Sequence, residues 1–181
     1  KTDPIYFLKS QKNNVEINNI KQIHKYDGAA FTKFIFWIKN NFKKRKITEI
    51  SAQEKLLNFK KKFKKFKTLS FPTISSTGSN GAIVHYNATK KTNKVLKKGY
   101  IYLVDSGGQY HFGTTDVTRT ISLDNKNKRI KKIFTQVLKG HLKLSNYKLT
   151  KNTTGNELDK VARESLNRIK LNYSHGTGHG V

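Results

Sequence analysis

Two aspartates, Asp105 and Asp116, flank a glycine-containing turn in the second half of the chain. Apolar residues before Asp105 predict a buried strand over residues 100–105, and a further strand is predicted over residues 116–123. If these strands pair, both carboxylates can lie on one face of the sheet, where they would repel each other unless a cation or a shared proton relieved the repulsion. A divalent metal ion is one solution, because it prefers hard oxygen ligands. An ordinary pair of turn aspartates is the alternative.

Two histidines four residues apart, His175 and His179, lie among glycines in residues 174–181. Glycine offers no apolar side chain for core packing, and it lets the backbone approach a ligand closely. An imidazole can bind a metal ion or carry a proton, and this spacing allows one of each. A phosphate-binding loop is the alternative, but the Lys-Ser/Thr ending of that motif is missing here.

A further histidine, His85, stands in a predicted strand over residues 82–86. A lone strand histidine is more typical of the surface, or of a hydrogen-bonded core position, than of a catalytic site. Taken by itself, His85 therefore receives no functional assignment.

The elements that must position these side chains follow the order helices, strands, helices. Apolar residues recur at helical spacing over residues 15–42, where Gly28 marks a break or a tight packing contact, and Thr48 is the expected N-cap of a second helix. Alternating and apolar stretches predict strands over residues 69–76, 82–86, 100–105 and 116–123. Helical spacing returns after residue 125, and a last helix is predicted from about Thr154, with Glu157 completing a capping box. This order predicts the α+β class, with antiparallel strands.

The amino-acid composition excludes several kinds of site. The 181 residues include no Cys, which excludes a disulfide, a thiolate zinc site and a cysteine nucleophile, so any metal ion must be held by His and carboxylates. No apolar run approaches the roughly 20 residues that span a bilayer, so no membrane association is expected. The absence of Met predicts that the chain is an internal segment of a longer protein.

The charge is strongly positive, with 37 Lys and Arg against 11 Asp and Glu and a formal net charge of +26. Such an excess could bind phosphate backbones. The lysines accompany many Asn and Ile, as a bias toward A/T-rich codons would produce, and no zinc-finger or RNA-recognition signature accompanies them. Lysine-rich runs at residues 43–46 and 60–65 fall in predicted helices. We therefore expect solvated helix faces and no specific nucleic-acid partner.

Five short motifs occur along the chain: TEIS at residues 48–51, SFPTISSTG at 70–78, DSGGQY at 105–110, GTTDVTRT at 113–120 and HGTGHGV at 175–181. Together they resemble aminopeptidase P, the Xaa-Pro aminopeptidase family, in its long three-domain eukaryotic form. They occur in the family's order and spacing, and the likeness runs from about Asp3 to the last residue. Prolidases and methionine aminopeptidases share the same metal centre, but the DSGGQY motif and the Gly-Thr-Gly between the histidines favour aminopeptidase P.

The resemblance implies a creatinase-like "pita-bread" catalytic domain, in which a curved antiparallel sheet is flanked by helices, and a centre of two divalent metal ions, most often Mn²⁺. Carried over by motif, Asp105 would chelate one ion, Asp116 would bridge both, and His179 would bind one ion through its imidazole. His85 and His175 match family histidines that orient the substrate and assist proton transfer. The implied reaction uses a metal-activated water to release the N-terminal residue of peptides that have proline in the second position.

The resemblance also implies what lies outside the chain. Residues 1–12 are predicted to be a linker from a missing preceding domain, and residues 13–181 the N-terminal part of the metallopeptidase domain. Two glutamate ligands follow the last motif in the family, so the segment by itself is expected to be inactive. A homodimer in the cytoplasm, or in a digestive compartment, is implied for the full-length protein. The alternative is a noncatalytic pita-bread module that binds nucleic acid or histones through its basic surface.

Overall fold

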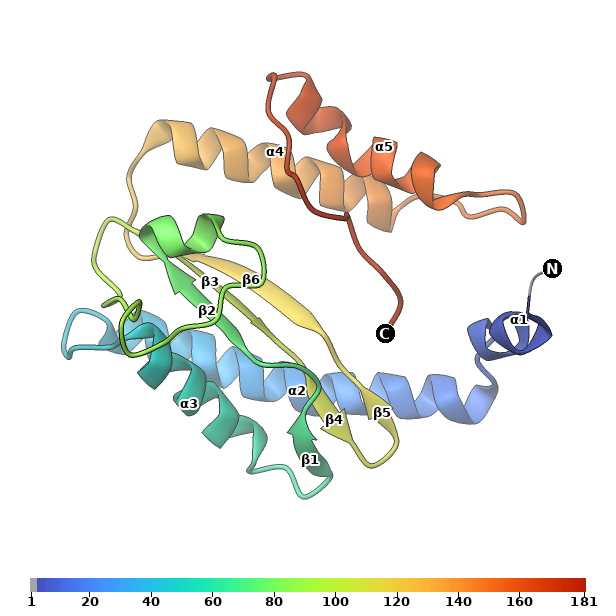
Figure 1. Ribbon diagram of the computed structural model, residues 1–181, viewed down its shortest axis with the longest axis horizontal. Helices are drawn as coiled ribbons and strands as arrows, with labels where there is room; N and C mark the ends of the chain where they lie inside the picture. The colour runs from blue at the N-terminus through green and yellow to red at the C-terminus, as the bar shows by residue number, and fades with distance from the viewer. Residues whose placement is uncertain (1–2) are drawn as a thin grey trace. The chain divides into compact units, whose positions relative to one another are not determined.

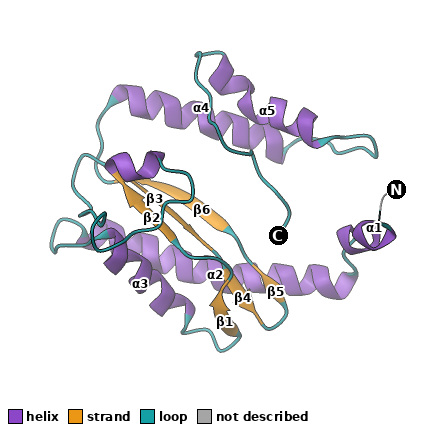
Figure 2. Ribbon diagram, viewed as in Figure 1, coloured by secondary structure: helices purple, strands orange, loops and turns teal. Residues whose placement is uncertain are grey.

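The structure, a computed structural model, describes residues 3–181 (Figure 1). The chain divides into two compact units. The first comprises the chain up to Asn125 together with Val181, and the second comprises residues 126–180. Strands and helices make up the first unit, whereas the second is built on helices (Figure 2).

Three helices precede the strands of the first unit: α1 Pro4–Ser10, α2 Asn14–Asn41 and α3 Glu49–Lys60. Both long helices begin at a capping box. Thr48 caps α3 as predicted, because its hydroxyl accepts a hydrogen bond from the backbone N–H of Ser51. The short α1 lies within the segment predicted to be a linker, and all of its residues are exposed.

Helix α2 runs through Gly28 without a break, so that part of the prediction was wrong. The expected tight contact at Gly28 was also wrong, because the space around this residue is open. The apolar stripe of α2 is present, and its buried members recur at helical spacing. They are Ile23, Ala30, Phe31, Phe34 and Ile38, with Asp27 as a buried polar residue on the same face.

The strands among the described residues form two three-stranded antiparallel sheets (Figure 2). One sheet has the order β1-β4-β5, with bounds β1 Phe66–Leu69, β4 Gly108–Tyr110 and β5 Gly113–Thr114. The other has the order β2-β3-β6, with bounds β2 Ile74–Thr77, β3 Ile101–Ser106 and β6 Val117–Ser122. The strands predicted over residues 100–105 and 116–123 are therefore confirmed as β3 and β6. The strand predicted over residues 69–76 is split into β1 and β2 around Pro72, which has no N–H to donate to a ladder.

The strand predicted over residues 82–86 was wrong. The 3₁₀-helix η1 Gly78–Ala82 follows β2 directly, and a turn follows η1. Gly78 has a φ of +59°, a left-handed conformation that glycine adopts readily, and this turns the chain out of the sheet. His85 therefore lies in a turn and not in a strand.

One face of the β2-β3-β6 sheet packs against α2 and α3. The hydrophobic core joins Phe34 of α2, Leu56 of α3, and Tyr102 and Val104 of β3, and the rings of Phe34 and Tyr102 lie 6.3 Å apart. Burying each large apolar side chain of this kind contributes roughly 1.5–3 kcal/mol. Because Tyr102 and Val104 face the helices, the alternate residues of β3 lie on the opposite face of the sheet.

The second unit pairs α4 Lys128–Ser145 with α5 Gly155–Asn167 (Figure 1). The predicted capping box is confirmed, because Thr154 accepts from the backbone of Glu157 and the Glu157 carboxylate accepts from the backbone of Thr154. The helices approach closely at Gly140, where an added Cβ would lie 2.2 Å from the backbone oxygen of Ala162. Only glycine fits there.

The lysine-rich runs are mostly solvated, but their assignment to helices was wrong except at Lys60. Residues 43–46 and 61–65 lie outside helices, after the ends of α2 and α3. Residues 43–46 are exposed, and so are the lysines at 61, 62, 64 and 65. Lys60 is fully buried, at 0% exposure, so its assignment to a solvated face was wrong. Within the described part of the chain, no helix has the length and apolar character needed to cross a membrane.

Candidate active site

Asp105 and Asp116 lie in and beside two paired strands, β3 and β6. Asp105 of β3 lies opposite Thr118 of β6, and Asp116 directly precedes β6. Val104 and Val117, from the same two strands, pack on the core side. Because side chains alternate along a strand, Asp105 and Thr118 lie on the opposite face, and Asp116, two residues before Thr118, falls on that face as well. The two aspartates are diagonal neighbours, which in a regular ladder have Cα atoms about 7–8 Å apart.

Both aspartates are half-buried. Two carboxylates on one face of a sheet repel each other, and a cation between them relieves that repulsion. Their oxygens are hard donors of the kind that divalent cations prefer. The donor chemistry and the shared face of Asp105 and Asp116 therefore fit a metal ion.

The turn between the two aspartates depends on a close backbone contact. A Cβ added at Gly107 would lie 1.9 Å from the backbone oxygen of Thr115, so no other residue fits. The Thr115 hydroxyl accepts a hydrogen bond from the backbone N–H of Gly108 at 2.9 Å. Ser70 reinforces the contact by donating its hydroxyl to the Thr115 carbonyl at 3.0 Å. This contact holds together the chain segments that follow Asp105 and precede Asp116.

A buried ion pair lies in the same unit. The Lys60 ammonium is 2.5 Å from Oδ1 of Asp27, and Tyr110 donates its hydroxyl to the same oxygen at 2.8 Å. Burial lowers the pKa of Lys60, an effect that the negative charges of Asp27 and Asp105 oppose. Burial and the neighbouring Asp27 charge raise the pKa of Tyr110 far above its usual value. Asp105 thus lies close enough to Lys60 to affect the pKa of the lysine.

His85 lies in an exposed turn after η1. It has a positive φ of 55°, which is uncommon for a residue other than glycine. The next residue, Tyr86, is only 5% exposed and is anchored by its hydroxyl. His85 therefore has an accessible imidazole and directly precedes a residue, Tyr86, whose side chain is buried and hydrogen-bonded.

His175 lies in a loop that α5 holds in the second unit. Its ring stacks on Tyr173, with ring centres 4.7 Å apart, and the guanidinium of Arg163 lies 3.9 Å from the centre of the Tyr173 ring. Arg163 also donates to the backbone oxygens of Tyr173 at 2.6 Å and His175 at 2.9 Å. Asp159 accepts hydrogen bonds from Thr177 and Arg163, which lower the pKa of the Asp159 carboxyl. Arg163 and Asp159 of α5 thus hold the loop that carries His175.

The geometry of His179 bears on its suitability as a ligand. Its Nδ1 lies 2.8 Å from the backbone oxygen of Gly180. A proton on Nδ1 would satisfy this contact and make Nε2 the basic nitrogen of the neutral ring, which is the form that binds a metal ion. His175 has the same arrangement toward the backbone oxygen of Gly176, also at 2.8 Å.

The predicted site residues are divided between the units. Asp105, Asp116 and His85 belong to the first unit, whereas His175 and His179 belong to the second. Residues 3–181 contain no group of three or more His, Asp or Glu side chains arranged to hold a metal ion. The structure thus brings the two aspartates together and leaves their association with His179 as a prediction.

Sequence reasoning missed two supporting residues. Glu49, fully buried, accepts hydrogen bonds from the stretch that carries His85, and Arg163 organises the loop of His175. Glu49 lies in the TEIS motif, which was a usable signal. Arg163 could be suspected only from its spacing to Asp159, one helical turn earlier.

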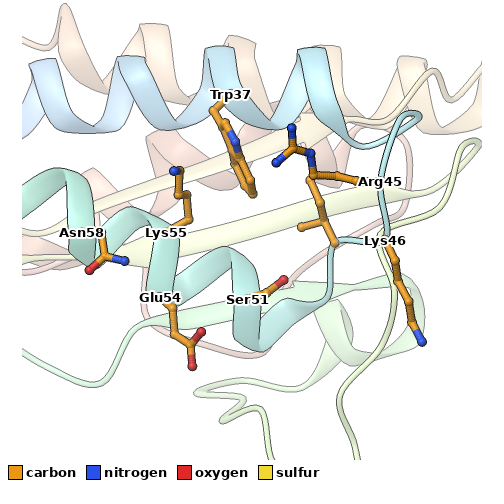
Figure 3. Close-up of a pocket in the computed structure, with 8 residues that line it drawn as sticks. Trp37, Arg45, Lys46, Ser51, Glu54, Lys55 and Asn58 are labelled. Carbon is orange, nitrogen blue, oxygen red and sulfur yellow. The ribbon is translucent and has the colours of Figure 1, made fainter.

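A hollow of about 230 Å³ lies elsewhere, beside α2 and α3 (Figure 3). Figure 3 shows Trp37 of α2 and Lys55 of α3 on its wall, and the Lys55 ammonium lies 5.4 Å from the centre of the Trp37 ring. The residues that line it are Trp37, Arg45, Lys46, Ile47, Ser51, Glu54, Lys55 and Asn58. None of the predicted site residues is among them, so this hollow is separate from the candidate site.

The sequence profile of metallopeptidase family M24 matches residues 18–181. The chain belongs to this family. A probable Xaa-Pro aminopeptidase P of Phaeosphaeria nodorum is 45% identical over 180 residues, a match that covers 98% of the M24 chain and 28% of the relative. Another, from Arthroderma otae, is 44% identical and is matched over 98% of this chain and 29% of its own. The resemblance to Xaa-Pro aminopeptidases is confirmed.

Solved structures confirm the predicted α+β, pita-bread fold class. The X-prolyl aminopeptidase of Caenorhabditis elegans, described as a cytosolic enzyme with a di-nuclear active site, superposes with a TM-score of 0.93 at 35% identity, over 99% of the M24 chain and 30% of its own. The X-Pro aminopeptidase of Thermotoga maritima superposes with a TM-score of 0.75 at 27% identity, over 88% of this chain and 42% of its own. The chain spans about three-tenths of the length of the curated relatives that it matches.

Proposed function

We propose that this M24 chain is part of a metal-dependent aminopeptidase that releases the N-terminal residue of peptides with proline in the second position. The observation that carries the proposal is the placement of Asp105 in β3 and of Asp116 directly before its partner strand β6, in a chain 45% identical to a probable Xaa-Pro aminopeptidase P. The activity is proposed for the intact protein, because the chain spans only about three-tenths of the length of the curated relatives that it matches.

Each named side chain has a proposed task. Asp105, Asp116 and His179, together with the two glutamates that the family resemblance implies, would hold two divalent ions, for which we propose Mn²⁺ because the resemblance implies it. Such ions, when bound, polarise a carbonyl and activate a water molecule for attack. The substrate amide is tertiary and has no N–H, so the chain must recognise it without that donor. His85, exposed on its turn, would orient the peptide, and His175 would handle the proton that reaches the leaving amine.

We propose that the full-length protein is a homodimer, as the family resemblance implies. We also propose that it is cytoplasmic, in keeping with the cytosolic description of the C. elegans enzyme. The comparisons give no support for a digestive compartment. The noncatalytic alternative is not favoured, because Asp105, Asp116 and His179 are all retained. The exposed lysines supply charge, and we propose no specific nucleic-acid partner for them.

The test compares matched peptides in the intact protein. Cleavage of an Arg-Pro-Pro peptide should require added divalent metal, should stop on chelation and should return with Mn²⁺, while an Arg-Ala-Ala peptide should be cleaved at least about tenfold more slowly, a difference of about 1.4 kcal/mol in the barrier. Equal cleavage of both peptides, or cleavage that survives chelation, would contradict the proposal.

A further inference from the structure

Glu49 is a buried carboxylate at the first position of α3, with 0% exposure. Its Oε1 accepts from the backbone N–H of Thr77 at 2.8 Å, and its Oε2 accepts from the backbone N–H of Lys94 and the hydroxyl of Tyr86, each at 2.9 Å. The amide of Asn80 lies 3.0 Å from both oxygens. Both oxygens of Glu49 thus act as acceptors for several donors at once.

The Glu49 side chain is held by hydrogen bonds and not by an ion pair. No Lys, Arg or His side chain forms a salt bridge with Glu49 in the part of the chain that the structure describes. A buried charge is tolerated only when such contacts replace its water. All four donors come from one stretch, residues 77–94. The carboxylate thus fastens this stretch to α3 at several points.

His85 lies inside that stretch. It is the third residue of a turn that is closed by a hydrogen bond from the backbone N–H of Tyr86 to the carbonyl of Ile83 at 3.2 Å. Ile83 and Val84 are 56% and 50% exposed, so the turn has little apolar anchoring of its own. Its two flanks are held by Glu49, through Asn80 on one side and Tyr86 on the other.

We propose that Glu49 is a positioning residue, which fixes the turn that presents His85 to the peptide. This inference rests on the proposed function, in which His85 acts on the substrate. Glu49 does not touch the reacting atoms, and it acts through Tyr86 and Asn80. A displacement of a catalytic side chain by about 1 Å can lower turnover by about a hundredfold, so the anchoring of this turn bears directly on the rate.

The test uses Glu49→Gln in the intact protein, with Glu54→Gln as the matched control on the exposed face of the same helix. The amide of Gln sets an N–H₂ group against the backbone N–H of Thr77 or of Lys94. We expect kcat for an Xaa-Pro peptide to fall at least about tenfold, with KM and metal content unchanged, and amide hydrogen exchange over residues 77–86 to accelerate by a similar factor. Tyr86→Phe, which removes one of the donors to Glu49, should move kcat and exchange in the same direction by less. Glu54→Gln should change neither.

A double variant separates positioning from a general loss of folding. If Glu49 acts through His85, Glu49→Gln should lower kcat by less than about twofold in the His85→Ala background. If the double variant lost kcat by the product of the two single losses, the inference would be overturned. Unchanged amide exchange over residues 77–86 in Glu49→Gln would also overturn it. If His85→Ala itself turned over normally while Glu49→Gln still loosened the turn, the failure would lie in the role proposed for His85, and the positioning role would fall with it.

Discussion

The buried ion pair of Lys60 and Asp27 offers a sharp test of the fold beneath the candidate site. Both side chains are almost completely buried, with exposures of 0% and 1%. Lys60→Met keeps an unbranched side chain of similar length but removes the ammonium group. Asp27 then retains the Tyr110 hydroxyl as a hydrogen-bond donor, while its Oδ2 is buried without a hydrogen-bond partner. Removing one partner of a buried pair costs about 3–5 kcal/mol, because the other charge is left uncompensated.

The neighbouring residue supplies a matched control. Lys61 is exposed, and Lys61→Met makes the same chemical change at the next position. Surface substitutions of this kind usually change stability by about 0.5 kcal/mol or less. A double variant, Asp27→Leu with Lys60→Met, removes both charges and should regain most of the loss. The Tyr110 hydroxyl would still lack its acceptor, at a cost of about 1–3 kcal/mol.

The assay is native-state hydrogen exchange of the amides in α3, which reports the local free energy of opening even in a protein of several domains. At about 1.4 kcal/mol for each factor of ten, Lys60→Met should accelerate exchange by a hundredfold or more, and Lys61→Met by less than about threefold. Equal, small effects of the two variants would refute the reasoning, because they would show that Lys60 is solvated.

Three further results are expected. Arg163→Lys loses the planar group that contacts Tyr173 and His175, so it should lower kcat about tenfold at constant metal content. Arg168→Lys changes an exposed side chain of the same stretch and should leave kcat unchanged. Equal effects of the two variants would argue against a role of Arg163 in fixing the loop of His175. His179→Ala should reduce the metal content, and His175→Ala should lower turnover without metal loss; the reverse pattern would exchange their assignments. Burial raises the pKa of Tyr102 well above its usual value of about 10. The Tyr102 hydroxyl therefore ionises at a lower pH in the unfolded chain than in the folded one. Its contribution to the free energy of unfolding is complete below pH 10 and is lost as the pH rises further. The stability of Tyr102→Phe, followed by urea unfolding, should therefore decline less steeply than that of the wild type above pH 10, and parallel declines would contradict this.

Local signals in the sequence predicted much of the fold. Thr48 and Glu157 act within one helical turn, and both caps are present. The apolar run before Asp105 correctly indicated a buried strand, and the aspartate pair emerged from strand order alone. Such features depend on neighbours a few residues away, which a sequence displays directly.

The errors arose from partners far apart in the chain. Residues 82–86 have the composition of a strand, but Glu49, 37 residues before Tyr86, draws that side chain inward and leaves a turn. Lys60 stands in a basic run, yet its partner Asp27 is 33 residues away. Neither pairing leaves a periodic trace in the sequence. The roles proposed for His85 and His175 came from motif resemblance, because an isolated histidine has no pattern of its own.

The most direct test of the central claim is the metal content and Xaa-Pro turnover of Asp116→Asn in the intact protein. The matched control is Asp124→Asn, at a partly exposed aspartate that pairs with Lys43, where a φ of 56° suits Asn as well. We expect Asp124→Asn to keep its metal and its turnover, and Asp116→Asn to lose bound metal and at least about a hundredfold in turnover, equivalent to about 2.7 kcal/mol of barrier. Full metal content with near-normal turnover in Asp116→Asn would contradict the account.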